Sequence, residues 1–222
     1  MSVLAHPFSS AGPSTLWPRL ILGSTSRYRR ELLERLRLPF DVMASQVDET
    51  PLAAESPAAL SLRLAHAKAA AVAQMCADDV VVIGSDQVAE LAGQPMGKPG
   101  GFERAFAQLR AMSGQSVVFH TSVAVHRPKT GFVAGCHGEV RVRFRALSDR
   151  DITTYLRLDE PYDCAGSARC ETLGIALLEA IDSDDPTMLI GLPLIRTSEL
   201  LRQAGLDPLA VLAQTPQRSQ HE

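Results

Sequence analysis

The sequence predicts an α/β fold, because apolar segments with strand character alternate with segments of helical periodicity. The clearest strand is an uninterrupted Val-Val-Val-Ile run at 80–83, which is typical of a buried central strand. The clearest helix follows Ser56-Pro57, where serine suits the N-cap and proline the first helical position. A shorter strand at 19–22 precedes a helical pattern at 27–36. This alternation is the pattern of an α/β protein.

The second half of the chain continues the pattern. The predicted elements are helices at 102–112, 148–158 and 197–203, strands at 117–125 and 138–145, and a loop followed by a strand within 164–178. Arginines alternate with apolar residues at 138–145, which predicts a strand with one face in water. A nucleic-acid-binding strip is the alternative for these arginines, and the net charge of −3 does not favour it.

Length and composition restrict the class of protein. The chain has 222 residues, 45% hydrophobic and 21% charged, which fits one substantial core or one domain with two lobes around a cleft. The net charge of −3 provides no general attraction to nucleic acid or to an anionic membrane, so we expect neither as a partner. A phosphate ligand would have to be bound by a few local cations.

The chain ends and the cysteines predict a cytoplasmic protein. Residues 1–18 lack the basic start and apolar run of a signal peptide, and no stretch has the length of a membrane span. We expect 1–18 to be a flexible extension, 19–209 the folded domain and 210–222 a frayed tail. Cys136 stands next to His137, but no second pair completes a zinc site, so free thiols in a reducing cytosol are the better interpretation.

Several cations lie where a bound anion would explain them. Residues 23–26 form a polar turn before the first helix, where N–H groups and the helix dipole attract anions. Arg29 lies in the first helical turn, although a cation there opposes the dipole. Lys68 shares an apolar helical stripe, for which snorkelling to solvent is the ordinary explanation, and Lys98 lies in a Gly-Lys-Pro-Gly loop. These cations could instead surround a phosphate.

Two carboxylates could complete such a site. We expect Asp86 just past the carboxyl end of the strand at 80–83, where open α/β sheets bind ligands, although a turn or N-cap role is an equal alternative. Glu49 follows Asp48 in a loop that could be simply a solvated acidic turn. If Glu49 and Asp86 converge with the cations, they could hold a polyphosphate through a divalent metal, with one carboxylate free to activate water.

A series of separate motifs resembles the Maf-like nucleoside triphosphate pyrophosphatase family over about residues 19–209. The matching segments are Leu22-Gly23-Ser24-Thr25-Ser26 with Arg29-Arg30, Val47-Asp48-Glu49, Ala67-Lys68-Ala69, Gly84-Ser85-Asp86-Gln87-Val88, Gly97-Lys98-Pro99, Ser113-Gly114, Cys164-Ala165-Gly166-Ser167 and Gly191-Leu192-Pro193-Leu194. The resemblance implies a single two-lobed domain, with a mixed, strongly twisted sheet flanked by helices and a central cleft. It also implies cleavage of a nucleoside triphosphate to the monophosphate and pyrophosphate with a divalent cation, Mg²⁺ or Mn²⁺, and a homodimer as a family-level expectation.

The resemblance also implies roles for individual residues. Asp86 is implied as the proton acceptor that activates water, and Glu49 and Asp86 as the carboxylates on the metal. The implied phosphate-binding groups are Ser24, Arg29, Lys68 and Lys98.

Three further residues are similar to the branch of the family that hydrolyses 7-methyl-GTP: Gln87, Glu171 and the aromatic Tyr28. A methylated guanine carries a positive charge, which an aromatic face attracts and a carboxylate offsets. Two alternatives remain at this stage: a broader pyrophosphatase for dTTP, UTP or damaged nucleotides, and a nucleotide-binding regulator of cell division.

Overall fold

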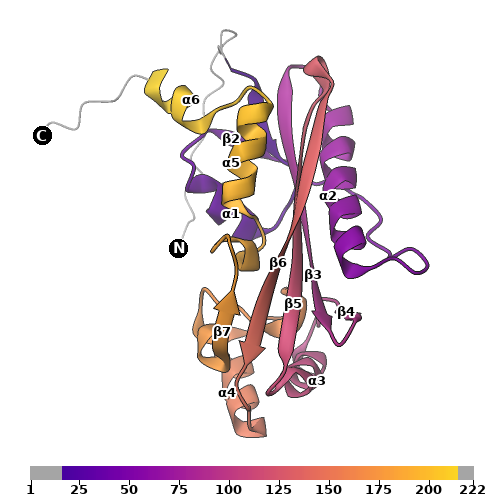
Figure 1. Cartoon of the computed structure of the whole chain (residues 1–222), viewed down its shortest axis with the longest axis vertical. Helices are drawn as coiled ribbons and strands as arrows, with labels where there is room; N and C mark the ends of the chain where they lie inside the picture. The colour runs from indigo at the N-terminus through magenta and orange to yellow at the C-terminus, as the bar shows by residue number, and fades with distance from the viewer. Residues whose placement is uncertain (1–16, 215–222) are drawn as a thin grey trace, which may run out of the picture.

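The computed structural model describes residues 17–214, and within them the strands form one mixed seven-stranded sheet (Figure 1). The strands lie in the order β2-β1-β3-β5-β6-β7, with β4 paired to β3 off this path. Their bounds are β1 (Arg19–Leu22), β2 (Phe40–Val42), β3 (Val80–Leu91), β4 (Gln94–Met96), β5 (Ser116–Arg127), β6 (Phe132–Phe144) and β7 (Leu178–Asp182). Residues 1–16 and 215–222 are not described, so most of the expected extension at 1–18 and the end of the expected tail at 210–222 lie outside the described residues.

The sheet changes character at β3. Strand β1 pairs in parallel with both β2 and β3, whereas the β3–β5, β5–β6 and β6–β7 pairs are antiparallel. The long strands β3, β5 and β6 run through the molecule and connect its two ends (Figure 1). The predicted mixed sheet is therefore confirmed.

Helices flank the sheet on both faces (Figure 1). They are α1 (Arg27–Glu34), α2 (Pro57–Gln74), α3 (Phe102–Met112), α4 (Asp149–Asp159), α5 (Leu194–Gln203) and α6 (Pro208–Gln214). Two large apolar clusters form the core: α1, α5 and α6 pack at one end of the sheet, and α3 and α4 at the other. A third cluster lies beneath α2. This division corresponds to the expected two lobes.

The predicted starts of α2 and α4 agree with the structure because their capping groups are local, whereas α5, predicted from residue 197, begins at Leu194. The Ser56 hydroxyl accepts a hydrogen bond from the Ala59 N–H, and Pro57 occupies the first turn of α2. Ser148 and Asp151 form a reciprocal capping box at α4.

Among the described residues, no helix is both long and apolar enough to cross a membrane.

The structure corrects the expected position of Asp86. Strand β3 does not end at Ile83 but continues to Leu91, because β5 pairs with it from Val82 to Glu90. Asp86 therefore lies within the strand. The parallel partner β1 does stop at Leu22, opposite Ile83, so Asp86 emerges just beyond the end of the neighbouring strand.

Three smaller expectations also differ. The segment before the first long helix contains a short strand, β2, where the sequence indicated only irregular structure. The strand expected within 164–178 begins only at Leu178, after two short 3-10 helices, Ala165–Ser167 and Leu173–Leu177. Residues 210–214 are helical in α6 rather than frayed, because Val211 packs into the core.

Candidate functional site

A cavity of about 940 Å³ lies where the β1–α1 turn, α2 and β3 meet. The loop at 44–51, the end of β4 with the following residues 97–98, and the segments at 163–171 and 189–191 complete its walls. Every site residue expected from the sequence lines this cavity: Ser24, Tyr28, Arg29, Glu49, Lys68, Asp86, Gln87, Lys98 and Glu171. Three separate regions of sequence therefore converge, as anticipated.

Lys68 connects the two carboxylates of the cavity. Its Nζ lies 2.7 Å from Asp86 Oδ1 and 2.5 Å from Glu49 Oε1. Lys68 and Asp86 are buried, whereas the Glu49 side chain is 55% exposed toward the open side. Lys68 does not snorkel to bulk solvent, because its ammonium is bound between two anions. The two carboxylates therefore lie on either side of one positive charge.

Close packing of α2 on β3 produces this contact. A Cβ built on Gly84 would lie 2.1 Å from the Ala65 carbonyl oxygen and 2.6 Å from the Ala69 nitrogen. Only glycine allows the helix to approach the strand so closely. Gly84 therefore brings Lys68 over Asp86, two residues further along β3.

The β1–α1 turn positions Arg29. Its Nη1 donates to Ser24 Oγ at 3.3 Å, and its Nε donates to the Gly191 carbonyl at 2.9 Å. Ser85 Oγ donates to the same carbonyl at 3.0 Å. The turn at Gly191, far away in sequence, thereby connects the arginine to the strand that carries Asp86.

Charges across the cavity influence one another. Desolvation lowers the pKa of the Arg29 guanidinium, and the carboxylates of Asp86 and Glu49 oppose this effect. Partial burial would raise the pKa of Glu49, but the hydrogen bond and charge of Lys68, with the charges of Lys98 and Arg29, hold that pKa below its usual value. The positive charges of Lys68, Lys98 and Arg29 thus all act on the Glu49 carboxylate.

Gln87 points away from Asp86 along the alternating strand. Its amide nitrogen donates to Thr121 Oγ1 and to the carbonyls of Met188 and Leu189, at 2.9–3.1 Å. These acceptors occupy the N–H groups of the amide. Gln87 therefore presents its carbonyl oxygen, an acceptor, as the group available to a ligand in the cavity.

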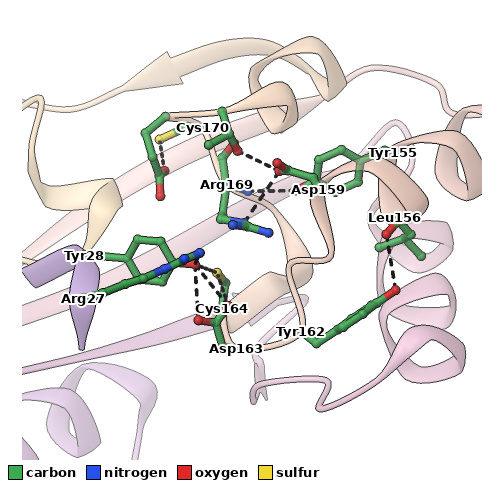
Figure 2. A network of polar contacts seen from close by, with 12 residues as sticks. Arg27, Tyr28, Tyr155, Leu156, Asp159, Tyr162, Asp163, Cys164, Arg169 and Cys170 are labelled. Atoms are coloured by element: carbon green, nitrogen blue, oxygen red, sulfur yellow. Dashed lines mark hydrogen bonds and ion pairs between the residues drawn. The ribbon is translucent and has the colours of Figure 1, made fainter. Parts of the chain in front are cut away.

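Tyr28 belongs to a polar network at another wall of the cavity (Figure 2). Arg27 and Cys164 both donate to its hydroxyl oxygen, and the hydroxyl donates to Asp163 at 3.1 Å. The Arg27 guanidinium lies 4.7 Å from the centre of the Tyr28 ring. Desolvation raises the pKa of Tyr28 well above its ordinary value, so the hydroxyl stays protonated. One ring face is thus already covered by a cation.

Sequence reasoning missed Arg169, which also lines the cavity. The side chain is buried, and its Nε lies 3.6 Å from Asp159 Oδ2 without a hydrogen bond. Its backbone N–H donates to the Tyr155 hydroxyl, which fixes the segment behind Tyr28 (Figure 2). The sequence signal that could have identified Arg169 is that it is a basic residue within the glycine-containing segment at 164–174. Glu171, two residues further on, is exposed.

Fold and cavity together define an α/β protein with a charged cavity suited to a small polyanion. A sequence profile of the family described as "Maf-like protein" matches residues 19–204. This chain belongs to that family.

Two bacterial relatives are similar to this chain over most of their length. The "7-methyl-GTP pyrophosphatase" of Polaromonas sp. (strain JS666) is 61% identical over 187 residues, covering 84% of this chain and 85% of that protein. The protein of the same name from Albidiferax ferrireducens is 58% identical, covering 86% of this chain and 96% of its own length. The solved structure of the Staphylococcus aureus Ham1 protein is 16% identical with a TM-score of 0.42, and the match covers 57% of this chain and 71% of that one.

Proposed function

We propose that this protein is a nucleoside triphosphate pyrophosphatase that hydrolyses 7-methyl-GTP to 7-methyl-GMP and pyrophosphate. The main support is the convergence of two carboxylates and three cations, Arg29, Lys68 and Lys98, around one cavity. The names of the relatives, which are 56–61% identical to this chain, support the particular substrate. Such an enzyme would remove modified nucleotides from the cellular pool.

In this proposal Glu49 and Asp86 hold a divalent cation, Mg²⁺ or Mn²⁺. Both carboxylates contact the Lys68 ammonium, so their oxygens lie close together, and the divalent cation would bind beside this ammonium. Carboxylate oxygens are the ligands that these hard cations prefer. When bound, the cation would neutralise charge on the triphosphate during the displacement.

The chain's own residues would direct the hydrolysis. Asp86 accepts a proton from water as the water oxygen bonds to the α-phosphorus, and the bond from that phosphorus to the bridging oxygen breaks. Pyrophosphate leaves with the bond electrons, and 7-methyl-GMP remains. Lys68 fixes the position of Asp86, while Ser24, Arg29 and Lys98 bind the phosphate oxygens.

Selection of the base would occur at the opposite wall. Guanine presents N–H donors on its pairing edge, and Gln87 and Glu171 both offer acceptors there. The methylated base is cationic, so the free face of the Tyr28 ring and the Glu171 carboxylate favour it over neutral bases. Residues 19–209 would form this catalytic unit, working in the cytoplasm as a homodimer.

The decisive experiment is a product analysis with 7-methyl-GTP in heavy-oxygen water. We expect pyrophosphate and a labelled 7-methyl-GMP, because attack at the α-phosphorus places the solvent oxygen in the monophosphate. Release of single phosphate, or label in pyrophosphate, contradicts the proposal. Equal turnover of dTTP, UTP and 7-methyl-GTP would instead favour a broader pyrophosphatase, and binding without turnover would favour a regulator.

A further inference from the structure

A second group of metal-ligating side chains lies on the sheet, outside the cavity. His120 on β5 and His137 and Glu139 on β6 offer ligand atoms that all lie within 4.8 Å of one another. Strand register causes this convergence: His120 pairs with Glu139, and His137 pairs with Ser122. Directly paired and alternate residues share one face of an antiparallel sheet, so the three side chains project together. None of them lines the cavity.

The distances within the group suit a common ion. His120 Nδ1 lies 3.1 Å from His137 Nε2 and 3.7 Å from Glu139 Oε1. Two nitrogens bound at ~2.0–2.1 Å to a tetrahedral zinc ion are separated by about 3.3 Å. The side chains therefore need little rearrangement to ligate one ion. Glu139 is 53% exposed, which leaves a route of entry from solvent.

The orientation of His120 provides an independent observation. Its side chain is only 7% exposed, and its Nε2 lies 2.8 Å from Glu90 Oε2 on β3. With Nε2–H donating to this carboxylate, the lone pair of a neutral ring is on Nδ1, which faces His137 and Glu139. A carboxylate behind a ligating histidine is a recurrent arrangement in metal sites.

We propose that His120 Nδ1, His137 Nε2 and Glu139 bind a zinc ion or similar transition metal, with Glu90 orienting His120. Imidazole nitrogens favour such metals over Mg²⁺, which prefers oxygen ligands. Three protein ligands leave a position for water. The bound metal would connect β5 with β6, and through Glu90 it would also connect them with β3. His120 on β5 pairs with Val88 on β3, a residue that lines the cavity.

The chain contains its own control. His66 Nδ1 and His126 Nε2 also lie 3.1 Å apart, with ring centroids at 5.4 Å compared with 5.3 Å for His120 and His137. Within the described residues, however, this second pair belongs to no group of three potential ligands. A histidine pair alone should bind the metal weakly. Substitution of His66 therefore distinguishes zinc binding at a metal site from the loss of a simple hydrogen bond between two imidazoles.

The test is calorimetric titration of the full chain with Zn²⁺ in excess Mg²⁺ and without nucleotide, so that Mg²⁺ competes at the oxygen-rich cavity. We expect one zinc ion per chain and a higher Tm with zinc. His137→Gln and Glu139→Gln should each weaken binding by at least about 10-fold, and Glu90→Gln by about 10- to 100-fold. His66→Gln should leave the affinity unchanged.

Circular dichroism of each variant identifies loss of folding, and Glu139→Gln, at an exposed position, keeps the test informative if His137→Gln does not fold. Absence of saturable binding in excess Mg²⁺ overturns the proposal. Equal weakening by His66→Gln and Glu139→Gln overturns it too. Zinc binding that is abolished by Glu49→Gln but retained in Glu139→Gln would assign the ion to the cavity and likewise overturn the site.

Discussion

The two walls of the cavity are constructed differently. At one wall, Lys68 and Asp86 are buried on α2 and β3, and Gly84 holds these elements in close contact. At the other, Asp163 and Glu171 are exposed on a segment of turns and short 3-10 helices. Groups on packed elements keep a precise geometry, whereas loop segments tolerate substitution. The proposed chemistry therefore depends on the core, while the part of the base selectivity proposed for Glu171 could change without altering the sheet.

The largest effect is expected from Asp86→Asn at the packed wall. Loss of the proposed base should lower kcat by about 100- to 10,000-fold, with the circular dichroism spectrum retained. Steady-state pyrophosphate release measures the effect. Asp41→Asn, an exposed carboxylate change on β2 outside the cavity, should leave kcat unchanged. Full activity of Asp86→Asn would remove the base assignment.

Glu171→Gln should alter selectivity rather than chemistry. The loss of a charged acceptor for the base should lower kcat/KM for 7-methyl-GTP by about 10- to 100-fold, with a smaller effect on dTTP and UTP. A substrate panel measures this ranking. Glu179→Gln on β7, where the carboxylate bonds Arg143 instead of facing the cavity, is the control. An unchanged ranking would mean that the exposed wall does not select the base.

Tyr28 provides a smaller test of the same wall. Tyr28→Leu should raise KM for 7-methyl-GTP by about 2- to 30-fold, because the aromatic face that attracts the cationic base is lost. Tyr28→Phe retains the ring and should stay closer to the parent enzyme. Measuring KM for unmethylated GTP as well separates the attraction between the ring and the cationic base from other contacts of the ring. Equal increases in KM for both nucleotides would argue against this attraction.

The smallest effect concerns the pH dependence of stability. The pKa of Glu49 in the folded chain lies below its ordinary value of 4.5, so its stabilising contribution is present above that pH and is lost as the pH falls through the folded pKa. Because Glu49 is 55% exposed, the contribution should be within about 1 kcal/mol.

Glu49→Gln should therefore lower Tm slightly at neutral pH, and the difference should vanish in acid. Thermal melts with a chelator present measure it. Removing Lys68 as well, in a double-mutant cycle, should abolish the difference if the ion pair is its source. A difference that persists in acid would point to another cause.

Local signals were sufficient for much of the fold. Ser56-Pro57 and the Ser148 capping box place the starts of α2 and α4 because each cap involves residues only three apart. The motif residues expected around the cavity do line it. Their roles remain predictions, since a motif identifies a position and experiments must assign its chemistry.

Non-local packing explains the errors. The Gly84-Ser85-Asp86 segment resembled the end of a strand, yet glycine is present there because α2 approaches β3, and β5 extends the strand past it. Strand β2 has only three residues and pairs with β1, so its short sequence carries little periodicity. The turns at 164–177 depend on Gly174, whose Cβ would lie 2.3 Å from the Arg169 carbonyl.

The sequence by itself determined the α/β class and the capped helices, because periodicity and caps act over a few neighbouring positions, and its motifs identified the residues that surround the cavity. Only the tertiary structure decided that Lys68 lies between Glu49 and Asp86, and that His120 meets both His137 and Glu90. Cys136-His137 alone did not indicate a metal site, since the second histidine, His120, comes from the neighbouring strand through the register of β5 and β6. Pairing of β3, β5 and β6 brings together side chains that lie 17 or more positions apart, and that separation conceals them from local patterns.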